Sequence, residues 1–67
     1  MSDYEKGMLS DMERMAKTYE ASAVHCKAAM DVATSALDRR ALLAEASAYS
    51  RCAKALYDLV ESWRKKL

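Results

Sequence analysis

Apolar and small residues recur along this chain at alternating steps of four and three residues. The first series runs through Met8, Met12, Met15, Tyr19, Ser22, Cys26, Ala29 and Ala33, and the second through Leu42, Ala46, Tyr49, Ala53, Leu56, Val60, Trp63 and Leu67. A period near 3.5, held for about four heptads, is typical of helices packed along their length. The pattern therefore predicts an all-α fold in which two long amphipathic helices face each other.

The two series do not share one register. Alternating steps of three and four carry the first series from Ala36 to Arg40, whereas the second series runs back to Arg39. The apolar stripe therefore slips by one residue within 34–41. We interpret the slip as a break between two helices.

A turn is the simplest explanation of this slip. Ser35, followed three residues later by Asp38, is a signal for the start of a helix. We predict helices over about 2–34 and 36–67, joined as an antiparallel hairpin that makes up a single domain, 1–67. No glycine marks the end of the first helix, so one continuous helix remains the alternative.

The start of the first helix has two candidate caps. Ser2 with Glu5 forms a Ser-x-x-Glu capping box, and Ser10 with Glu13 forms another. Gly7 lies between them and costs about 1 kcal/mol inside a helix. We place the start near Ser2, because the apolar spacing already begins before Ser10.

Bulky residues gather at the open end expected of this hairpin. Met8, Met12 and Met15 would lie around Trp63, while smaller side chains lie nearer the turn. Methionine is flexible and packs adaptably. We interpret this cluster as core, and the alternative is a groove that accepts a side chain of a partner.

Each helix carries more apolar surface than one neighbour covers. The additional positions are Leu9, Ala16, Ala23, Met30 and Leu37 in the first helix, and Ala41, Ala48, Ala55, Ser62, Leu43, Cys52, Tyr57 and Leu59 in the second. Exposed apolar stripes of this length mark interfaces, so we expect a homodimer that forms a four-helix bundle, or else a heteromeric partner. The protein-interface candidates are Leu9, Met30, Leu37, Leu43, Ala48, Ala55, Tyr57 and Leu59.

The composition agrees with a small helical domain, and the lack of targeting signals bears on the cellular compartment. The 67 residues include no proline and one glycine, and a chain this short buries little surface on its own. It has neither an apolar run long enough to span a bilayer nor a secretory signal, so we expect a cytoplasmic protein with no membrane contact.

The candidates for metal, redox or hydrolytic chemistry are few. His25, Cys26 and Cys52 fall short of the usual ligand set for zinc, so we expect a reduced cysteine pair, with a zinc site or a redox switch as alternatives. Ser22 and His25 lie one turn apart on a helix, without a pocket to exclude water. We expect no enzyme activity and no cofactor.

The net charge of +1 argues against a general attraction to nucleic acid. The first 34 residues carry a net −2 and the rest a net +3. Arg39, Arg40, Arg51 and Lys54 could still present a basic face to RNA or DNA phosphates. This is the second functional hypothesis.

In architecture, the expected dimer resembles the small helical hairpins that pair into four-helix bundles, such as the Rop plasmid-copy-number regulators. No sequence motif is shared with that family. In size and class the chain is also similar to regulators of phages and mobile elements, including anti-CRISPR and other anti-defence inhibitors. We therefore expect a non-enzymatic regulator or inhibitor that docks a helical face on a larger protein. The third hypothesis is a structural subunit of a hetero-oligomer.

Overall fold

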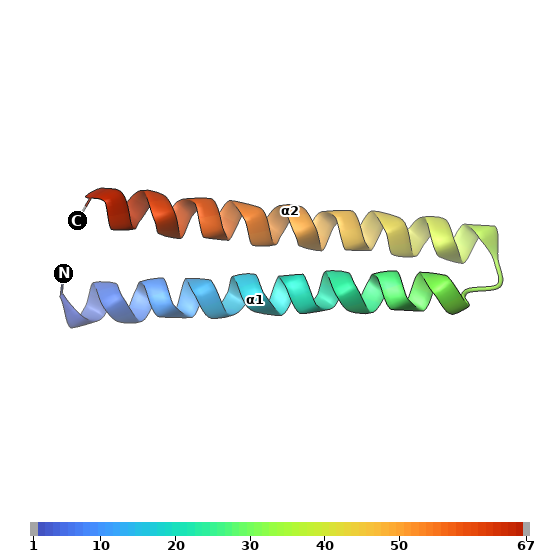
Figure 1. Ribbon diagram of the computed structural model, residues 1–67, viewed down its shortest axis with the longest axis horizontal. Coiled ribbons are helices and arrows are strands. Elements are labelled where there is room, and N and C mark those ends of the chain that lie inside the picture. The colour runs from blue at the N-terminus through green and yellow to red at the C-terminus, as the bar shows by residue number, and fades with distance from the viewer. Residues whose placement is uncertain (1, 67) are drawn as a thin grey trace.

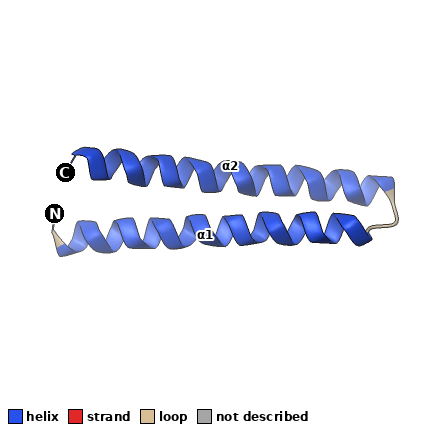
Figure 2. Cartoon of the chain, in the orientation of Figure 1, coloured by secondary structure: helices blue, strands red, loops and turns tan. Residues whose placement is uncertain are grey.

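The chain folds as an antiparallel pair of long helices. The computed structural model describes residues 2–66, in which α1 spans Asp3–Val32 and α2 spans Ala36–Lys66 (Figures 1 and 2). The molecule measures 50 × 15 × 11 Å. The predicted hairpin is confirmed, and the alternative of one continuous helix is wrong. The predicted end of the second helix at Leu67 lies outside the described residues.

The first capping box starts α1. The Ser2 hydroxyl accepts a hydrogen bond from the Glu5 backbone N–H at 3.1 Å and donates one to the Glu5 carboxylate at 2.9 Å. The Glu5 carboxylate accepts hydrogen bonds from the Ser2 hydroxyl and from the Ser2 backbone N–H, and both lower its pKa below the ordinary value. The predicted start near Ser2 is confirmed, and α1 continues through Gly7 and Ser10 without a break.

The turn forms where the two apolar series slip. Helix α1 ends at Val32, two residues before the predicted end, because Ala33 takes an extended conformation with φ −71° and ψ 133°. The Ser35 hydroxyl accepts a hydrogen bond from the Asp38 backbone N–H at 3.1 Å. Ser35 thus caps the start of α2 as predicted, by satisfying a backbone donor that the helix leaves unpaired.

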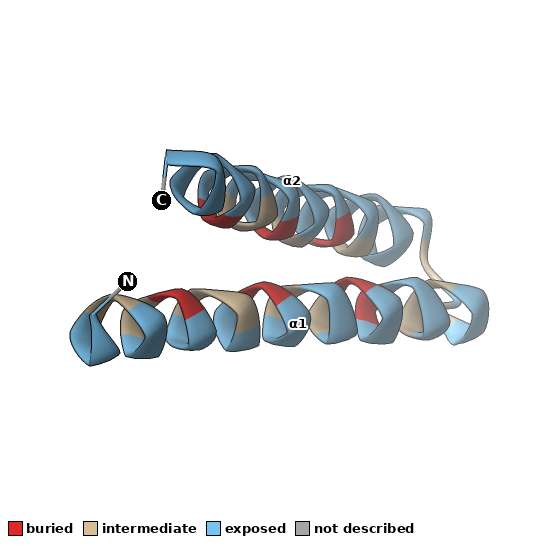
Figure 3. Ribbon diagram, turned by 60° about the vertical axis from the view of Figure 1, so that its left-hand side comes forward, coloured by how far each residue is buried: buried red, intermediate tan, exposed pale blue. Residues whose placement is uncertain are grey.

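The core between the helices is narrow and consists largely of alanine. Figure 3 shows the buried residues along the facing sides of α1 and α2. They are Leu9, Ala16, Ala23, Cys26, Ala46, Ala53 and Val60. Small side chains at these positions let two helix backbones approach closely, since nothing bulky holds them apart.

A tyrosine pair shows the register of the two helices. Tyr19 stacks on Tyr49, with ring centroids 6.0 Å apart. In antiparallel helices, this pairing places Ala16 level with Ala53, three residues before Tyr19 and four after Tyr49. Ala16 and Ala53 therefore lie opposite one another, and both are buried.

This packing corrects one of the predicted apolar series. The second series is confirmed from Leu42 to Val60, where each member is buried or half-buried. In the first series, Cys26 is buried, Met15 is 50% exposed and the other members are half-buried. The fully buried positions of α1 include Leu9, Ala16 and Ala23, each one residue after a member of the series. The spacing of fours and threes fits both stripes, so the pattern alone did not distinguish them.

Candidate binding surface

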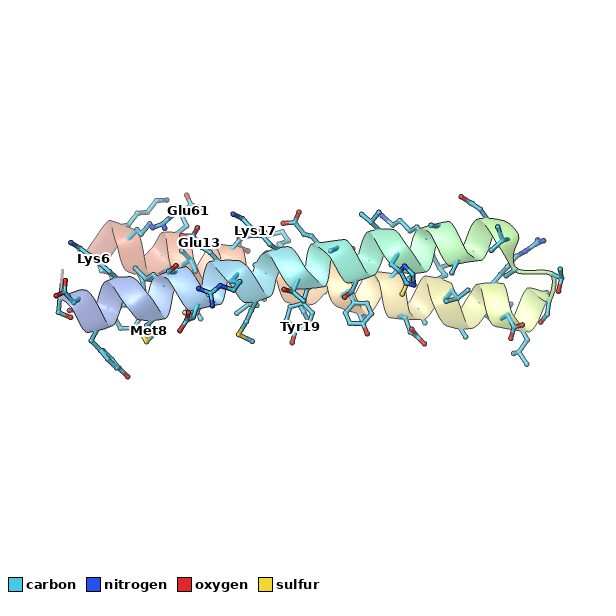
Figure 4. All side chains as sticks on the ribbon, turned by 90° about the horizontal axis from the view of Figure 1, so that it is seen from below. Lys6, Met8, Glu13, Lys17, Tyr19 and Glu61 are labelled. Carbon is cyan, nitrogen blue, oxygen red and sulfur yellow. The ribbon has the colours of Figure 1, made fainter. Side chains whose placement is uncertain are left out.

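The two long sides of the hairpin differ in chemical character. Because alanines fill the line of closest approach, the larger apolar side chains lie to one side of it. Figure 4 shows the division: Met8 and Tyr19 point to one edge, and charged side chains point to the opposite edge. The labelled charged residues are Lys6, Glu13, Lys17 and Glu61.

We call the first side the apolar flank. Its members come from one face of each helix. From α1 it includes Met8, Met12, Met15 and Tyr19, which line two shallow grooves together with Tyr4, Asp3, Asp11, Arg14 and Thr18. From α2 it includes Tyr49, which stacks on Tyr19, and the residues that follow Tyr49 on the same face by helical spacing: Cys52, Leu56, Leu59 and Trp63.

Several large side chains on or beside the apolar flank remain in water. Met15 is 50% exposed, Leu59 46% and Trp63 38%, and Tyr4 at the edge of the flank is 80% exposed. The ammonium of Lys66 lies over the Trp63 ring, 5.6 Å from its centroid. The hairpin thus buries four alanines between its helices and covers these large apolar residues only in part.

The opposite side is the charged flank, and polar contacts between the helices close it. Arg64 of α2 forms an ion pair with Glu13 of α1. Further along, a hydrogen bond to Glu20 raises the pKa of the Tyr57 hydroxyl above its ordinary value. These contacts join the helices along a solvated surface, where such pairs contribute little to stability.

Nearer the turn, the apolar flank becomes smaller and more polar. Cys26 lies 3.8 Å from the Glu45 carboxylate, and the same shallow groove is lined by His25 and Ser22. Burial and then the charge of Glu45 raise the pKa of the Cys26 thiol. Cys26 and Cys52 are both free thiols, the first buried and the second exposed. Within residues 2–66, no three His, Cys, Asp or Glu side chains are grouped so that they could hold a metal ion.

The predicted interface residues do not form one surface. Leu59 lies on the apolar flank, and Ala48 and Ala55 lie on the outer side of α2 next to it; all three are exposed. The remaining five lie elsewhere. Leu43 and Tyr57 are on the charged flank, Leu37 is exposed at the turn, Met30 is half-buried, and Leu9 is buried at 3% exposure.

Leu9 therefore needs a correction. It was assigned to a column that the hairpin leaves for a second chain, but α2 itself covers it. Conversely, Tyr4 and Met15 belong to the exposed surface. For Met15 this agrees with the alternative interpretation of the methionine cluster as a groove, whereas Tyr4 was not among the interface candidates. The only signal that could have identified them is the sevenfold repeat of alanine beside the methionines, which is typical of close helix contact.

The four predicted basic residues are all exposed, but two of them have partners within the chain. The Arg39 guanidinium donates a hydrogen bond to the Ala33 carbonyl oxygen at 3.0 Å. Lys54 forms an ion pair with Asp58 at 2.9 Å. Nucleic-acid binding through Arg39, Arg40, Arg51 and Lys54 stays a prediction from the sequence.

Arg39 has a structural role that Arg40 lacks. The last carbonyls of α1 have no partner within the helix, and none of the residues in its last turn is basic. A cation at this end also complements the helix dipole. We expect Arg39→Ala to lower the free energy of unfolding by about 1 kcal/mol, and Arg40→Ala to change it by less than about 0.5 kcal/mol. Urea titration followed by circular dichroism measures both; equal effects would contradict the capping role.

Compared with protein-family models, with curated proteins and with solved structures, the chain matches none of them. Within residues 2–66, neither helix has the combination of length and apolar character that crossing a membrane requires. The surface of the hairpin itself is therefore the feature from which a function can be inferred.

Proposed function

We propose that this chain is a non-catalytic association module that works by binding protein through its apolar flank. One observation carries the proposal: the hairpin buries mainly alanine between its helices and leaves Met15, Leu59 and Trp63 together on one flank, partly in water. The other exposed large aliphatic residues, Val24, Val32, Leu37 and Leu43, do not belong to this flank. Monomeric proteins rarely expose contiguous apolar surface unless it binds something. Isolated exposed leucines would carry no such meaning.

The shape of the surface supports binding to protein in preference to small molecules. The grooves on the apolar flank are shallow and follow α1 from Tyr4 to Tyr19. A pocket for a small ligand normally encloses most of that ligand. A long, flat, apolar strip instead matches the side of another helix, which contributes side chains at the same helical spacing.

A regulator or inhibitor is the role that we propose for such a module. A chain of 67 residues can occlude a surface on a larger protein by contact alone, without supplying chemistry. The methionines support this role, because flexible side chains adapt to the contours of a partner. This role requires a target protein that presents an apolar surface about as long as the flank.

The test compares two leucines of similar exposure on opposite flanks. A photoreactive phenylalanine analogue replaces Leu59 on the apolar flank or Leu43 on the charged flank, which are 46% and 52% exposed. The chain is produced in its own host cells, irradiated and separated by mass. We expect protein adducts from position 59 and far fewer from position 43. Equal yields at both positions, or none at position 59, would overturn the proposed function.

A further inference from the structure

We propose that the apolar flank binds the apolar flank of a second copy of this chain, so that two hairpins form a four-helix bundle with their turns at opposite ends. This inference rests on the proposed function and names the partner of the same surface. Three features of the hairpin support it: the area of its exposed surface, the distribution of large side chains along the flank, and the position of Cys52.

The hairpin exposes more surface than its mass explains. Its accessible surface is 5072 Å² at a mass of 7.5 kDa. A compact monomer of that mass exposes about 4,200 Å². The excess of roughly 800 Å² equals what one partner buries in a stable interface of standard size. A second hairpin laid along the flank would remove an area of this order from each copy.

Self-association also matches the chemistry of the flank. An interface between identical copies related by a two-fold axis requires one surface that is complementary to itself. The apolar side chains of the flank meet this condition, because they pack on one another without a fixed pairing. The charged residues that line the same grooves, Asp3, Asp11, Arg14 and Glu45, include both signs of charge. The charged flank mixes Glu13, Glu20 and Arg64 in contacts already formed within the hairpin, and it would stay on the outside of the bundle.

The distribution of bulk along the flank decides the orientation. The half near the chain ends carries Met8, Met15 and Trp63, and the half near the turn carries Ser22 and Ala29. If the turns of the two copies lay at the same end, the large side chains of one copy would pack against those of the other. The two hairpins would then be farther apart at the chain ends than at the turns. With the turns at opposite ends, the bulky half of each copy lies on the small half of the other, and the packing distance stays even.

This orientation places the Cys52 residues of the two hairpins next to each other. A two-fold axis that reverses the hairpin end for end sets α2 against α2 and α1 against α1. Cys52 lies near the middle of α2, on the flank, so it falls close to the axis. With the turns at the same end, α2 would face α1 and the two Cys52 residues would be diagonal to each other. A disulfide needs Cα atoms about 4.4–6.8 Å apart, so only the opposite-end bundle forms it readily.

The experiment measures mass in solution and then disulfide formation in the full chain. We expect sedimentation equilibrium to give twice the chain mass. Leu59→Glu should raise the dissociation constant about 30-fold or more, and Leu43→Glu on the charged flank should leave it within a few fold. Under mild oxidation, the wild-type chain and Cys26→Ser should form a covalent dimer, and Cys52→Ser should not. Because the oxidation test uses the wild-type chain, it stays informative if Leu59→Glu fails to fold.

Three results would overturn the proposal. The first is a single-chain mass at every concentration. The second is dissociation by Leu43→Glu in place of Leu59→Glu, which would assign the contact to the charged flank. The third is a dimer whose Cys52 residues do not join, which would reverse the orientation. A single-chain mass together with adducts from position 59 in cells would refute self-association and leave the proposed function standing.

Discussion

Leu9→Ala should lower the free energy of unfolding by about 2–5 kcal/mol, because it removes most of a buried side chain and leaves a cavity between the helices. Leu9 is 3% exposed, and Val60 is the only other large aliphatic residue among the buried set. A hairpin whose core is otherwise alanine and one cysteine has little stability in reserve. Thermal and urea unfolding followed by circular dichroism measure the loss.

Leu37→Ala is the matched control for this change. It deletes the same atoms from a leucine that is 76% exposed at the turn, so the free energy of unfolding should change by less than about 0.5 kcal/mol. A small effect of Leu9→Ala, or an equal effect of both substitutions, would mean that Leu9 is not packed between α1 and α2. Its place in the core would then be wrong.

Ala16→Leu should lower the free energy of unfolding by about 1–3 kcal/mol through overpacking. Ala16 is fully buried and level with the buried Ala53 of α2. Leucine is an excellent helix former, so the loss cannot come from the helix itself. The near-ultraviolet circular dichroism of the Tyr19–Tyr49 stack, one turn away, should weaken in the same variant.

Ala28→Leu provides the control for this second change. Ala28 is exposed on the outer side of α1, so leucine there adds the same atoms without meeting α2. We expect unchanged stability and an unchanged tyrosine signal. If Ala16→Leu were equally well tolerated, the helices would have room between them, and the large flank residues could turn inward. The exposed apolar flank, and with it the proposed function, would lose its structural basis.

The two predictions test one relation between core and surface. In this hairpin, Leu9, Val60, one cysteine and four alanines are buried between the helices, whereas Met15, Leu59 and Trp63 lie on the apolar flank and are partly exposed. Stability and binding therefore depend on different residues. Substitutions at Leu9 or Ala16 should act on folding, whereas substitutions at Leu59 should act on association.

The sequence by itself determined the secondary structure and the place of the turn. Helical periodicity, the Ser2–Glu5 box and the Ser35 cap act within a few residues of each other, so they can be read from neighbouring positions. The second apolar series was read correctly because leucine, tyrosine and valine mark its buried side. Local chemistry also indicated that two helices carry more apolar surface than they share.

Only the tertiary structure decided which apolar surface is inside. Along α1, two candidate stripes differ by one residue, about 100° of rotation about the helix axis. Helical spacing allows both the stripe through Met8 and Met15 and the one through Leu9 and Ala16, and packing against α2 buries the second. The choice depends on the distance between the helices, which Ala46 and Ala53 of the other helix set jointly with Ala16. Because that distance depends on both helices, it cannot be predicted from the pattern of residues in one of them.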